Sequence, residues 1–544
     1  MKSGPIIKTT EGYVQGTALT SVLGQKYLAF KGIPFAQPPV GPLRFKEPHP
    51  PSKWSGIRDA SQDAGNVAIQ QMSDTPIPHK IYGEEDCLYL NVYAKKIGSK
   101  RRPVMFFIHG GNFVEGTGND CVYSQDYLIT QDMVLVHVNY RLGPMGFLNL
   151  GHEVAPGNQG LRDIIAALTW VQRNIESFGG DASNVTIFGS SAGAIICHLF
   201  TLIPMAKGLF HKTILQSGTI FMIKDLFRKN DFMNGFRVAS LLGFESDDPV
   251  QVIEFLRTVP ATKLIEIEDR VISKRERIVL SNGSYEPVYD ADYTSDPLIP
   301  LPIPELMKDA ADVPMIIGHT TNESLLNFIG EYNEETYRYY DDNIDEIVEN
   351  LLLCESARLP EIMRSVREFY LKNKPICKDT AWNLVNLVTD VMYHHFDRKL
   401  VDYRNERATA PTYVYNFSYM GNEPTIYQND QGPQPFHGVA HADELSYLYY
   451  LSYIRESMEE IQFPREGTKD RLTVDRLVKM WYNFAATGDP TPAVDERCIT
   501  AVWKPVQKHD LCYLDIGDEL ALRRDEDSES RSIYEKLRCY FFNF

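Results

Sequence analysis

The stretch NVTIFGSSAGA, residues 184–194, constrains the fold more than any other part of the chain. Its first half is a short apolar strand, and its second half places two serines between Gly189 and Gly193 at the start of a helical pattern. The spacing Gly-x-Ser-x-Gly between a strand and a helix is typical of a nucleophile elbow, which holds a serine in a strained turn. When Gly189 and Gly193 are aligned with the two glycines of this pattern, the serine position falls on Ser191 and Ser190 takes the first variable position. An ordinary strand-to-helix connection is the alternative.

Buried strands alternate with helices on both sides of this turn. The patterns predict strands over 102–111, 132–142, 184–190, 211–218, 313–323 and 412–419, and helices over 157–180, 191–203, 343–357 and 471–488. Apolar strands that alternate with helices indicate an α/β fold, a large and mostly parallel central sheet flanked by helices. In such sheets ligands bind beyond the carboxyl ends of the strands, where the glycines and polar residues of this chain cluster.

Composition narrows the class of protein. No repeat, low-complexity tract or glycine-serine linker divides the 544 residues, so we expect a single domain, 1–544, with helical insertions. A formal net charge of −17 disfavours binding to nucleic acid or to an anionic membrane surface. The longest apolar stretches are strand-sized, well short of the roughly 20 residues that span a bilayer. The N-terminus has no signal-peptide core, which predicts a cytoplasmic protein; a secreted form trimmed of its signal would look the same.

A glycine-rich turn follows the strand predicted over 102–111. The sequence His109-Gly110-Gly111-Asn112-Phe113 leaves backbone N–H groups free to point at a nearby site. A serine that attacks a carbonyl needs such donors for the oxyanion that forms. An ordinary turn at a strand end is the alternative, but the elbow some 80 residues later favours the oxyanion interpretation.

A serine nucleophile also needs a base and a carboxylate that orients the base. His441 lies in QPFHGVAHADELSYL, four residues after His437. These two histidines could instead hold a metal with Asp443 and Glu444, but the glutamate of a zincin motif is missing. Glu323 ends a predicted strand and completes the chain order serine, acid, histidine. From spacing alone it is one candidate among many carboxylates, and a solvated loop glutamate is the alternative.

Several motifs in order carry a resemblance. KGIPFAQPPVGPLRF, EDCLYLNVY, HGGNF, GNQGLRD, SFGGDASNVTIFGSSAG, ILQSG, GHTTNES, HADELSYL and FAATGDPTP cover nearly the whole chain. They resemble a type-B carboxylesterase of the cholinesterase/carboxylesterase family, and most of all the insect α-esterases. The resemblance implies an α/β-hydrolase fold whose active site lies in a gorge at the C-terminal ends of the strands.

The resemblance also implies roles for single residues. Ser191 resembles the nucleophile, His441 the base and Glu323 the acid. The remaining positions are oxyanion donors at Gly111, Asn112 and Ala192, supporting residues Ser217 and Gly110, a structural ion pair of Arg44 with Glu85, and pocket residues Phe113, Phe221 and Met222. No metal or organic cofactor is implied, and the expected assembly is a monomer or a weak homodimer.

Three positions depart from the family pattern. Asn112 replaces the third glycine of the usual oxyanion turn, and asparagine is among the residues that best tolerate positive φ. Ser190 stands where the family often has glutamate. Cys87 matches half of a disulfide of secreted relatives, but 61–71 contains no partner cysteine, which is consistent with a reduced protein. The stretch 67–86 also lacks the tryptophan that holds choline in cholinesterases, so we expect no choline site.

The expected function is that of a serine carboxylesterase, a carboxylic ester hydrolase acting through an acyl-enzyme. The apolar residues after Ser217 favour hydrophobic, neutral esters. The resemblance implies a broad range, organophosphates as covalent inhibitors, and a role in xenobiotic or insecticide detoxification or sequestration. A dedicated hormone or pheromone esterase is one alternative. A non-catalytic, cholinesterase-like binding protein is the other, and the intact triad positions disfavour it.

Overall fold

The computed structural model describes residues 2–62, 67–71, 80–227, 233–279, 283–328, 332–352, 356–429, 436–455, 463–508, 510–524 and 531–537. Cys354, Cys539 and parts of the stretch 61–86 lie outside these residues. Cys87, in contrast, is described as a free and fully buried thiol. Among the described residues, no helix combines the length and the apolar character that a bilayer crossing requires.

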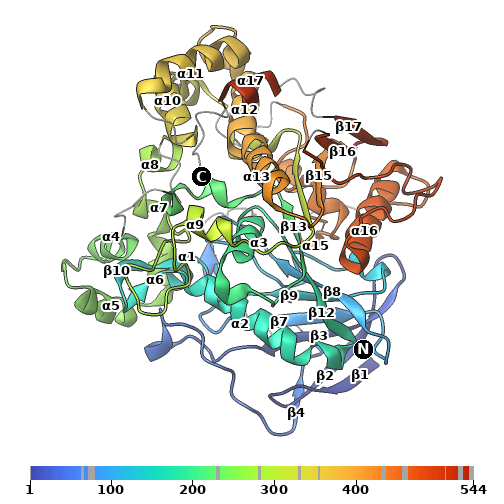
Figure 1. The fold of residues 1–544 in the computed structure, drawn as a ribbon. Helices are drawn as coiled ribbons and strands as arrows, with labels where there is room; N and C mark the ends of the chain where they lie inside the picture. Colours follow the sequence, from blue (N-terminus) through green and yellow to red (C-terminus); the bar gives the residue numbers. More distant parts are fainter. Residues whose placement is uncertain are drawn as a thin grey trace.

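A mixed sheet of 13 strands forms the centre of the described chain (Figure 1). Seven neighbouring strands run parallel, in the order β9, β8, β12, β13, β14, β15 and β16. Their bounds are Val134–Val138, Arg102–Ile108, Gly180–Ser190, Lys212–Gln216, Met315–Thr320, Thr412–Phe417 and Cys512–Ile516. The predicted α/β fold with a mostly parallel sheet is confirmed.

Antiparallel strands extend both edges of the sheet, which the sequence patterns did not predict. The bounds are β1 Lys2–Lys8, β2 Tyr13–Thr20, β3 Lys26–Pro34 and β7 Tyr89–Ala94 at one edge, with β4 Ile57–Asp59 paired to β2, and β17 Leu520–Arg524 at the other. Towards this edge burial becomes less complete: β2 mixes buried and exposed positions, in contrast to the nearly continuous burial of β8 and β9.

Helices cover the sheet and its carboxyl edge. The longer ones are α2 Gln159–Asn174, α3 Ala192–Leu202, α4 Asn234–Leu241, α5 Pro249–Thr258, α10 Glu334–Leu352, α11 Leu359–Val366, α12 Ala381–Thr389, α13 His395–Arg407 and α16 Lys469–Thr487, and α17 is Arg531–Leu537. In Figure 1, α10, α11, α12 and α17 gather at the top, while α16 lies at the right beside the sheet. A π-helical turn, η11 Asp390–His394, joins α12 to α13.

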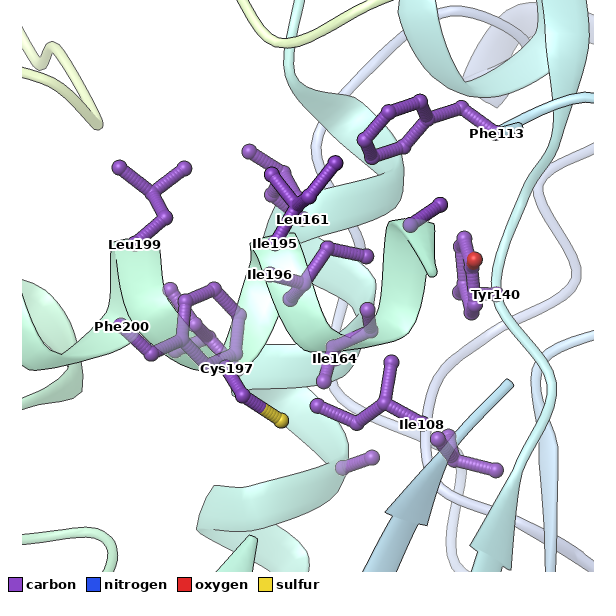
Figure 2. Packing of buried hydrophobic residues seen from close by; sticks show 14 of the residues in the cluster. Ile108, Phe113, Tyr140, Leu161, Ile164, Ile195, Ile196, Cys197, Leu199 and Phe200 are labelled. Atoms are coloured by element: carbon purple, nitrogen blue, oxygen red, sulfur yellow. The ribbon is translucent and has the colours of Figure 1, made fainter. Parts of the chain in front are cut away.

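The helix that follows the two serines is buried along its whole length. Ile195, Ile196 and Cys197 of α3 pack in one cluster with β8 and α2, and Figure 2 shows them beside Ile108 and Ile164. Each fully buried aliphatic side chain of this kind contributes roughly 1.5–3 kcal/mol to folding. Because α3 is fixed on all sides, the turn at its N-terminus is held rigidly against the sheet.

A buried ion pair that no sequence motif indicated ties the sheet to α2. Arg141 donates from Nε and Nη2 to both carboxylate oxygens of Asp163, at 2.8 and 2.7 Å, and its Nη1 donates to the Lys46 carbonyl. Both side chains are almost fully excluded from solvent, with 2% and 0% exposed. The two residues occur in NYRLG and GNQGLRD, so a charged residue inside each apolar stretch was the available signal.

We expect Asp163→Asn to lower the free energy of unfolding by about 3–5 kcal/mol, because the change leaves the Arg141 charge buried without a counter-ion. The shift is measured as the change in the urea midpoint. Glu266→Gln is the matched control: its partner Lys263 is exposed, and surface pairs contribute about 0–1 kcal/mol. Equal midpoints for the two variants would contradict the structural role of the buried pair.

Candidate active site

Ser191 lies at the junction of β12 and α3 in a conformation that few L-residues adopt. Its φ is 57° and its ψ −125°, a strained combination. The Ser191 N–H donates to the Gln216 carbonyl at 2.8 Å, and the Ser191 carbonyl accepts from the Ile195 N–H at 3.0 Å. These bonds fix both sides of the residue and hold it in the turn.

The two glycines that flank the serines cannot be replaced by larger residues, because there is no room for a side chain at either position. A Cβ at position 189 would lie 2.5 Å from the Ile108 carbonyl oxygen, and one at position 193 only 2.0 Å from it. Ser190 is buried, and its hydroxyl has no hydrogen-bond partner among the described residues, whereas Ser191 is half-buried. Exposure thus favours Ser191 over Ser190, as the register did.

The turn after β8 packs directly on this elbow. Three successive residues have positive φ: Gly111 at 107°, Asn112 at 50° and Phe113 at 62°. A Cβ on Gly110 would lie 2.6 Å from the Ser190 carbonyl oxygen, so the two turns are in contact. Within the described chain, the N–H groups of Gly111, Asn112 and Ala192 have no acceptor, which leaves them available to a ligand.

His109 fixes the base of the glycine-rich turn and is not placed to act as a base itself. Its ring stacks on Tyr140 with centroids 4.4 Å apart, and its Nδ1 donates to the Gly110 carbonyl at 2.8 Å. The Tyr140 hydroxyl donates to the His109 carbonyl at 3.1 Å. Burial lowers the pKa of His109 to about 4, so the ring is neutral near pH 7.

Glu323 and His441 form a buried hydrogen-bonded pair 118 residues apart in sequence. His441 Nδ1 lies 2.5 Å from Glu323 Oε2, and the Thr320 N–H donates to Glu323 Oε1 at 2.7 Å. The His441 N–H also donates to the Glu323 carbonyl at 3.2 Å. The carboxylate is completely buried and the histidine is 6% exposed. This pair sits after the carboxyl end of β14, at the same sheet edge as Ser191.

Each of the two groups shifts the pKa of the other so that the carboxylate form of Glu323 and the imidazolium form of His441 are both favoured. Burial alone would raise the pKa of Glu323, but the charge and hydrogen bond of His441 hold that pKa below its ordinary value. Burial alone would lower the pKa of His441, but the charge and hydrogen bond of Glu323 raise it. The Ser217 hydroxyl also lowers the pKa of Glu323 from close by, although it is not aligned for a regular hydrogen bond.

Gln216 links the serine turn to the histidine loop. Its backbone carbonyl accepts from Ser191, and its side-chain amide donates to Glu444 Oε1 at 3.0 Å. Burial raises the pKa of Glu444 to about 7 and that of Asp443 to about 8. The sequence pattern indicated these two carboxyls only as metal ligands; the structure places them in the His441 loop as buried groups with raised pKa values.

The other predicted residues are placed as follows. Arg44 donates from Nε and Nη2 to both oxygens of Glu85 at 2.5 Å, and its Nη1 donates to carbonyls at the end of α5, including that of Val259 at 2.6 Å. Phe113 and Phe221 are buried, with 1% and 2% exposed, Phe113 edge-on to Phe147 and Phe221 against Phe227. Met222 is half-buried and His437 is exposed. The pocket roles of the three apolar residues stay predictions.

A serine at a strand–helix elbow and a hydrogen-bonded histidine–glutamate pair, both at the carboxyl edge of a parallel sheet, define the class of α/β-hydrolases. The carboxylesterase family model matches residues 3–539, and the chain belongs to that family. It is a carboxylic ester hydrolase.

Insect esterases are among its similar proteins. A juvenile hormone esterase of Tribolium castaneum is 33% identical over 90% of this chain and 84% of its own length. Esterase FE4 of Myzus persicae is 32% identical over 93% of this chain and 87% of its own length. The solved structure of a juvenile hormone esterase from Manduca sexta, with OTFP covalently attached, aligns with a TM-score of 0.83 at 26% identity, covering 99% of this chain and 100% of that one.

Proposed function

We propose that this chain hydrolyses hydrophobic, neutral carboxylic esters through an acyl-enzyme on Ser191. The observation that carries the proposal is the strained Ser191 elbow facing the edge where Glu323 holds His441 at 2.5 Å. Strain of this kind persists only where the surrounding structure fixes it, and it clusters at active sites.

Each residue has one task in the proposed reaction. His441 accepts the Ser191 proton while the serine oxygen bonds to the ester carbon, and the N–H groups of Gly111, Asn112 and Ala192 stabilise the oxyanion. His441 then protonates the departing alcohol. Water, deprotonated by the same histidine, frees the acid and restores Ser191. Glu323 keeps the Nδ1 proton of His441 in place, so that Nε2 is the accepting nitrogen.

We further propose a broad substrate range with a role in xenobiotic turnover or sequestration. The family resemblance to insect α-esterases and the similarity to esterase FE4 support it. The covalently attached OTFP in the Manduca structure supports covalent inhibition of this chain as well, and organophosphates are the inhibitors that we expect to act here through Ser191. A dedicated hormone esterase is the second candidate, because two juvenile hormone esterases align over 90% and 99% of the chain.

The two candidates separate by substrate. We expect kcat/KM for 1-naphthyl acetate and p-nitrophenyl butyrate to exceed that for a long terpenoid methyl ester by roughly tenfold or more, about 1.4 kcal/mol in transition-state binding. A preference for the terpenoid ester would favour the hormone esterase. No turnover of any of the three by folded protein would favour a binding protein on the same scaffold.

A substitution at Asn112 tests whether the oxyanion turn limits the length of the acyl group that the site accepts. We expect Asn112→Gly to raise kcat/KM for long acyl chains several-fold over that for acetate, because glycine removes a side chain next to the acyl carbon while permitting the φ of 50°. The measurement is kcat/KM for p-nitrophenyl esters from acetate to octanoate. Identical chain-length profiles for the two proteins would show that Asn112 does not select substrates.

A further inference from the structure

A second polar site lies behind β14, the strand that leads into the Glu323 loop. A cavity of about 780 Å³ opens between β14, β15 and β16 on one side and α12, η11, α13 and α17 on the other. Ser191, Glu323 and His441 are not among the residues that line it. Its wall nonetheless includes His319, Thr321 and Asn322, the residues that lead into Glu323, so the cavity lies on the far side of the acid's own loop.

A chain of hydrogen bonds runs from this cavity wall to the catalytic pair. The Tyr370 hydroxyl donates to Asp390 Oδ2 at 2.7 Å, and His394 Nδ1 lies 2.9 Å from Asp390 Oδ1. His394 Nε2 lies 3.2 Å from the Thr320 carbonyl oxygen. The N–H of the same Thr320 donates to Glu323 Oε1 at 2.7 Å. The backbone of Thr320 therefore connects the bonds of Tyr370, Asp390 and His394 to the carboxylate that holds His441.

The partners of His394 determine its charge. A carbonyl oxygen and an ionised carboxylate only accept hydrogen bonds, so both ring nitrogens of His394 donate, and the ring is an imidazolium. Burial opposes this charge, but the hydrogen bond and the charge of Asp390, together with the Thr320 carbonyl and Glu323, raise the pKa of His394 above its ordinary value. Its side chain is 20% exposed, which gives the ring access to protons from the cavity.

Of the two histidine rings in contact at this place, only His394 carries a charge. The His319 ring lies against that of His394 at a tilt of 33°, with the centroids 3.9 Å apart. Burial and the charge of His394 lower the pKa of His319, which stays neutral. Burial raises the pKa of Asp397, whose Oδ2 lies 2.7 Å from His319 Nδ1. The titratable or charged groups around His394 come from four parts of the fold. The β14 side contributes His319 and Glu323, and η11 contributes Asp390; α13 contributes His395, Asp397 and Arg398, and the turn after α11 contributes Tyr370.

A local irregularity of the backbone places the two key residues. Asp390 and His394 are the first and last residues of the π-helical turn η11, inserted between two regular helices. Such turns are rare and occur frequently at functional sites. The inserted turn lets the Asp390 carboxylate bond to the His394 ring while that ring reaches across to β14.

We propose that His394 is a positioning residue for the catalytic acid. It donates a hydrogen bond to the carbonyl of Thr320 and so fixes this residue, and the N–H of Thr320 in turn holds the Glu323 carboxylate. His394 also places a positive charge behind the Glu323–His441 pair. The proposal rests on the proposed role of Glu323. A cation behind Glu323 disfavours a second cation on His441, which must be neutral to accept the Ser191 proton. His394 thus extends activity to lower pH.

The sign of the pH effect follows from this placement. In His394→Gln the positive charge is lost, so His441 keeps its proton to higher pH, and the acid limb of kcat/KM moves up by about half a unit. Because a glutamine amide still donates to the Thr320 carbonyl, kcat on the high-pH plateau changes less than about threefold. His394→Leu loses the donor as well, and we expect the same shift with a roughly tenfold fall in plateau kcat at unchanged KM.

The experiment is the pH dependence of kcat/KM for p-nitrophenyl butyrate from pH 5 to 9, with folding of each variant checked by circular dichroism. His395→Gln is the matched control: it alters the next residue on the same cavity wall, and burial lowers the pKa of His395 to about 4, so no charge is lost. We expect the wild-type profile for this control.

Two results would overturn the positioning role. One is an unshifted acid limb in folded His394→Gln, and the other is an equal loss of rate at every pH, which a purely structural residue would give. Ser191→Ala is assayed alongside. If that variant retains activity, the proposed function fails; if it is inactive while His394→Gln keeps the wild-type profile, only the role of His394 fails.

Discussion

Ser191→Ala lowers kcat for p-nitrophenyl butyrate on the order of a million-fold, the largest effect that we expect of any single substitution. Without the hydroxyl no acyl-enzyme forms, and only the oxyanion donors and substrate binding are left to accelerate attack by water. The substitution removes one oxygen from a half-buried position, so the fold is not expected to change. The measurement is the initial rate at substrate saturation, with enzyme concentration checked by absorbance.

Ser190→Ala is the matched control for this prediction. The Ser190 hydroxyl is buried and has no hydrogen-bond partner among the described residues, so its removal breaks no contact. We expect kcat within about twofold of the wild type, because deletion of an unpaired buried hydroxyl costs little. A large loss in Ser190→Ala with activity retained in Ser191→Ala would mean that the register of the elbow is wrong.

Glu323→Gln gives the second-largest effect, a fall in kcat on the order of ten-thousandfold. The glutamine amide is close in size to the carboxylate, but it can donate a hydrogen bond to His441 Nδ1. That bond stabilises the tautomer whose Nε2 carries the proton, and this nitrogen then cannot accept the proton of Ser191. The Thr320 N–H at 2.7 Å can still bond to the amide oxygen, which preserves the geometry.

The measurement for Glu323→Gln is kcat across pH 5–9, because a tautomer defect lowers the plateau and does not merely shift it. Glu85→Gln serves as a control, since its carboxylate is bound to Arg44 and does not contact the candidate site. We expect Glu85→Gln to lower stability without a comparable loss of kcat. A Glu323→Gln enzyme with nearly full activity would show that another carboxylate orients His441.

The sequence predicted the central part of the molecule because the constraints there are local. The elbow needs Gly189 and Gly193 for space, and the Gly110–Gly111 turn contacts it, so both leave a pattern in the chain. The central parallel strands, such as β9 and β13, are buried on both faces and form continuous apolar runs, whereas β16, with alternating burial, was not predicted. The strands β1 to β4 lie outside the parallel centre of the sheet, and β2 and β3 mix buried and exposed positions, so they left no comparable pattern.

The acid and its supporting network could not be found in the same way. Glu323 is one carboxylate among many until the resemblance or the fold places it 2.5 Å from His441. His394 reaches the acid loop through a π-helical turn, which breaks the 3.6-residue spacing on which helix patterns depend. The contact between residues 320 and 394 depends on where the fold places η11 relative to the end of β14, and no local motif records it.

The nucleophile is identified most directly by locating a covalent adduct. The protein is titrated with paraoxon until esterase activity is lost, and the modified peptide is identified by mass spectrometry. We expect one diethylphosphoryl group per chain, attached to Ser191, and none in Ser191→Ala. An adduct on Ser190, or folded protein that hydrolyses esters but takes up no phosphoryl group, would contradict the claim that Ser191 is the nucleophile of this esterase.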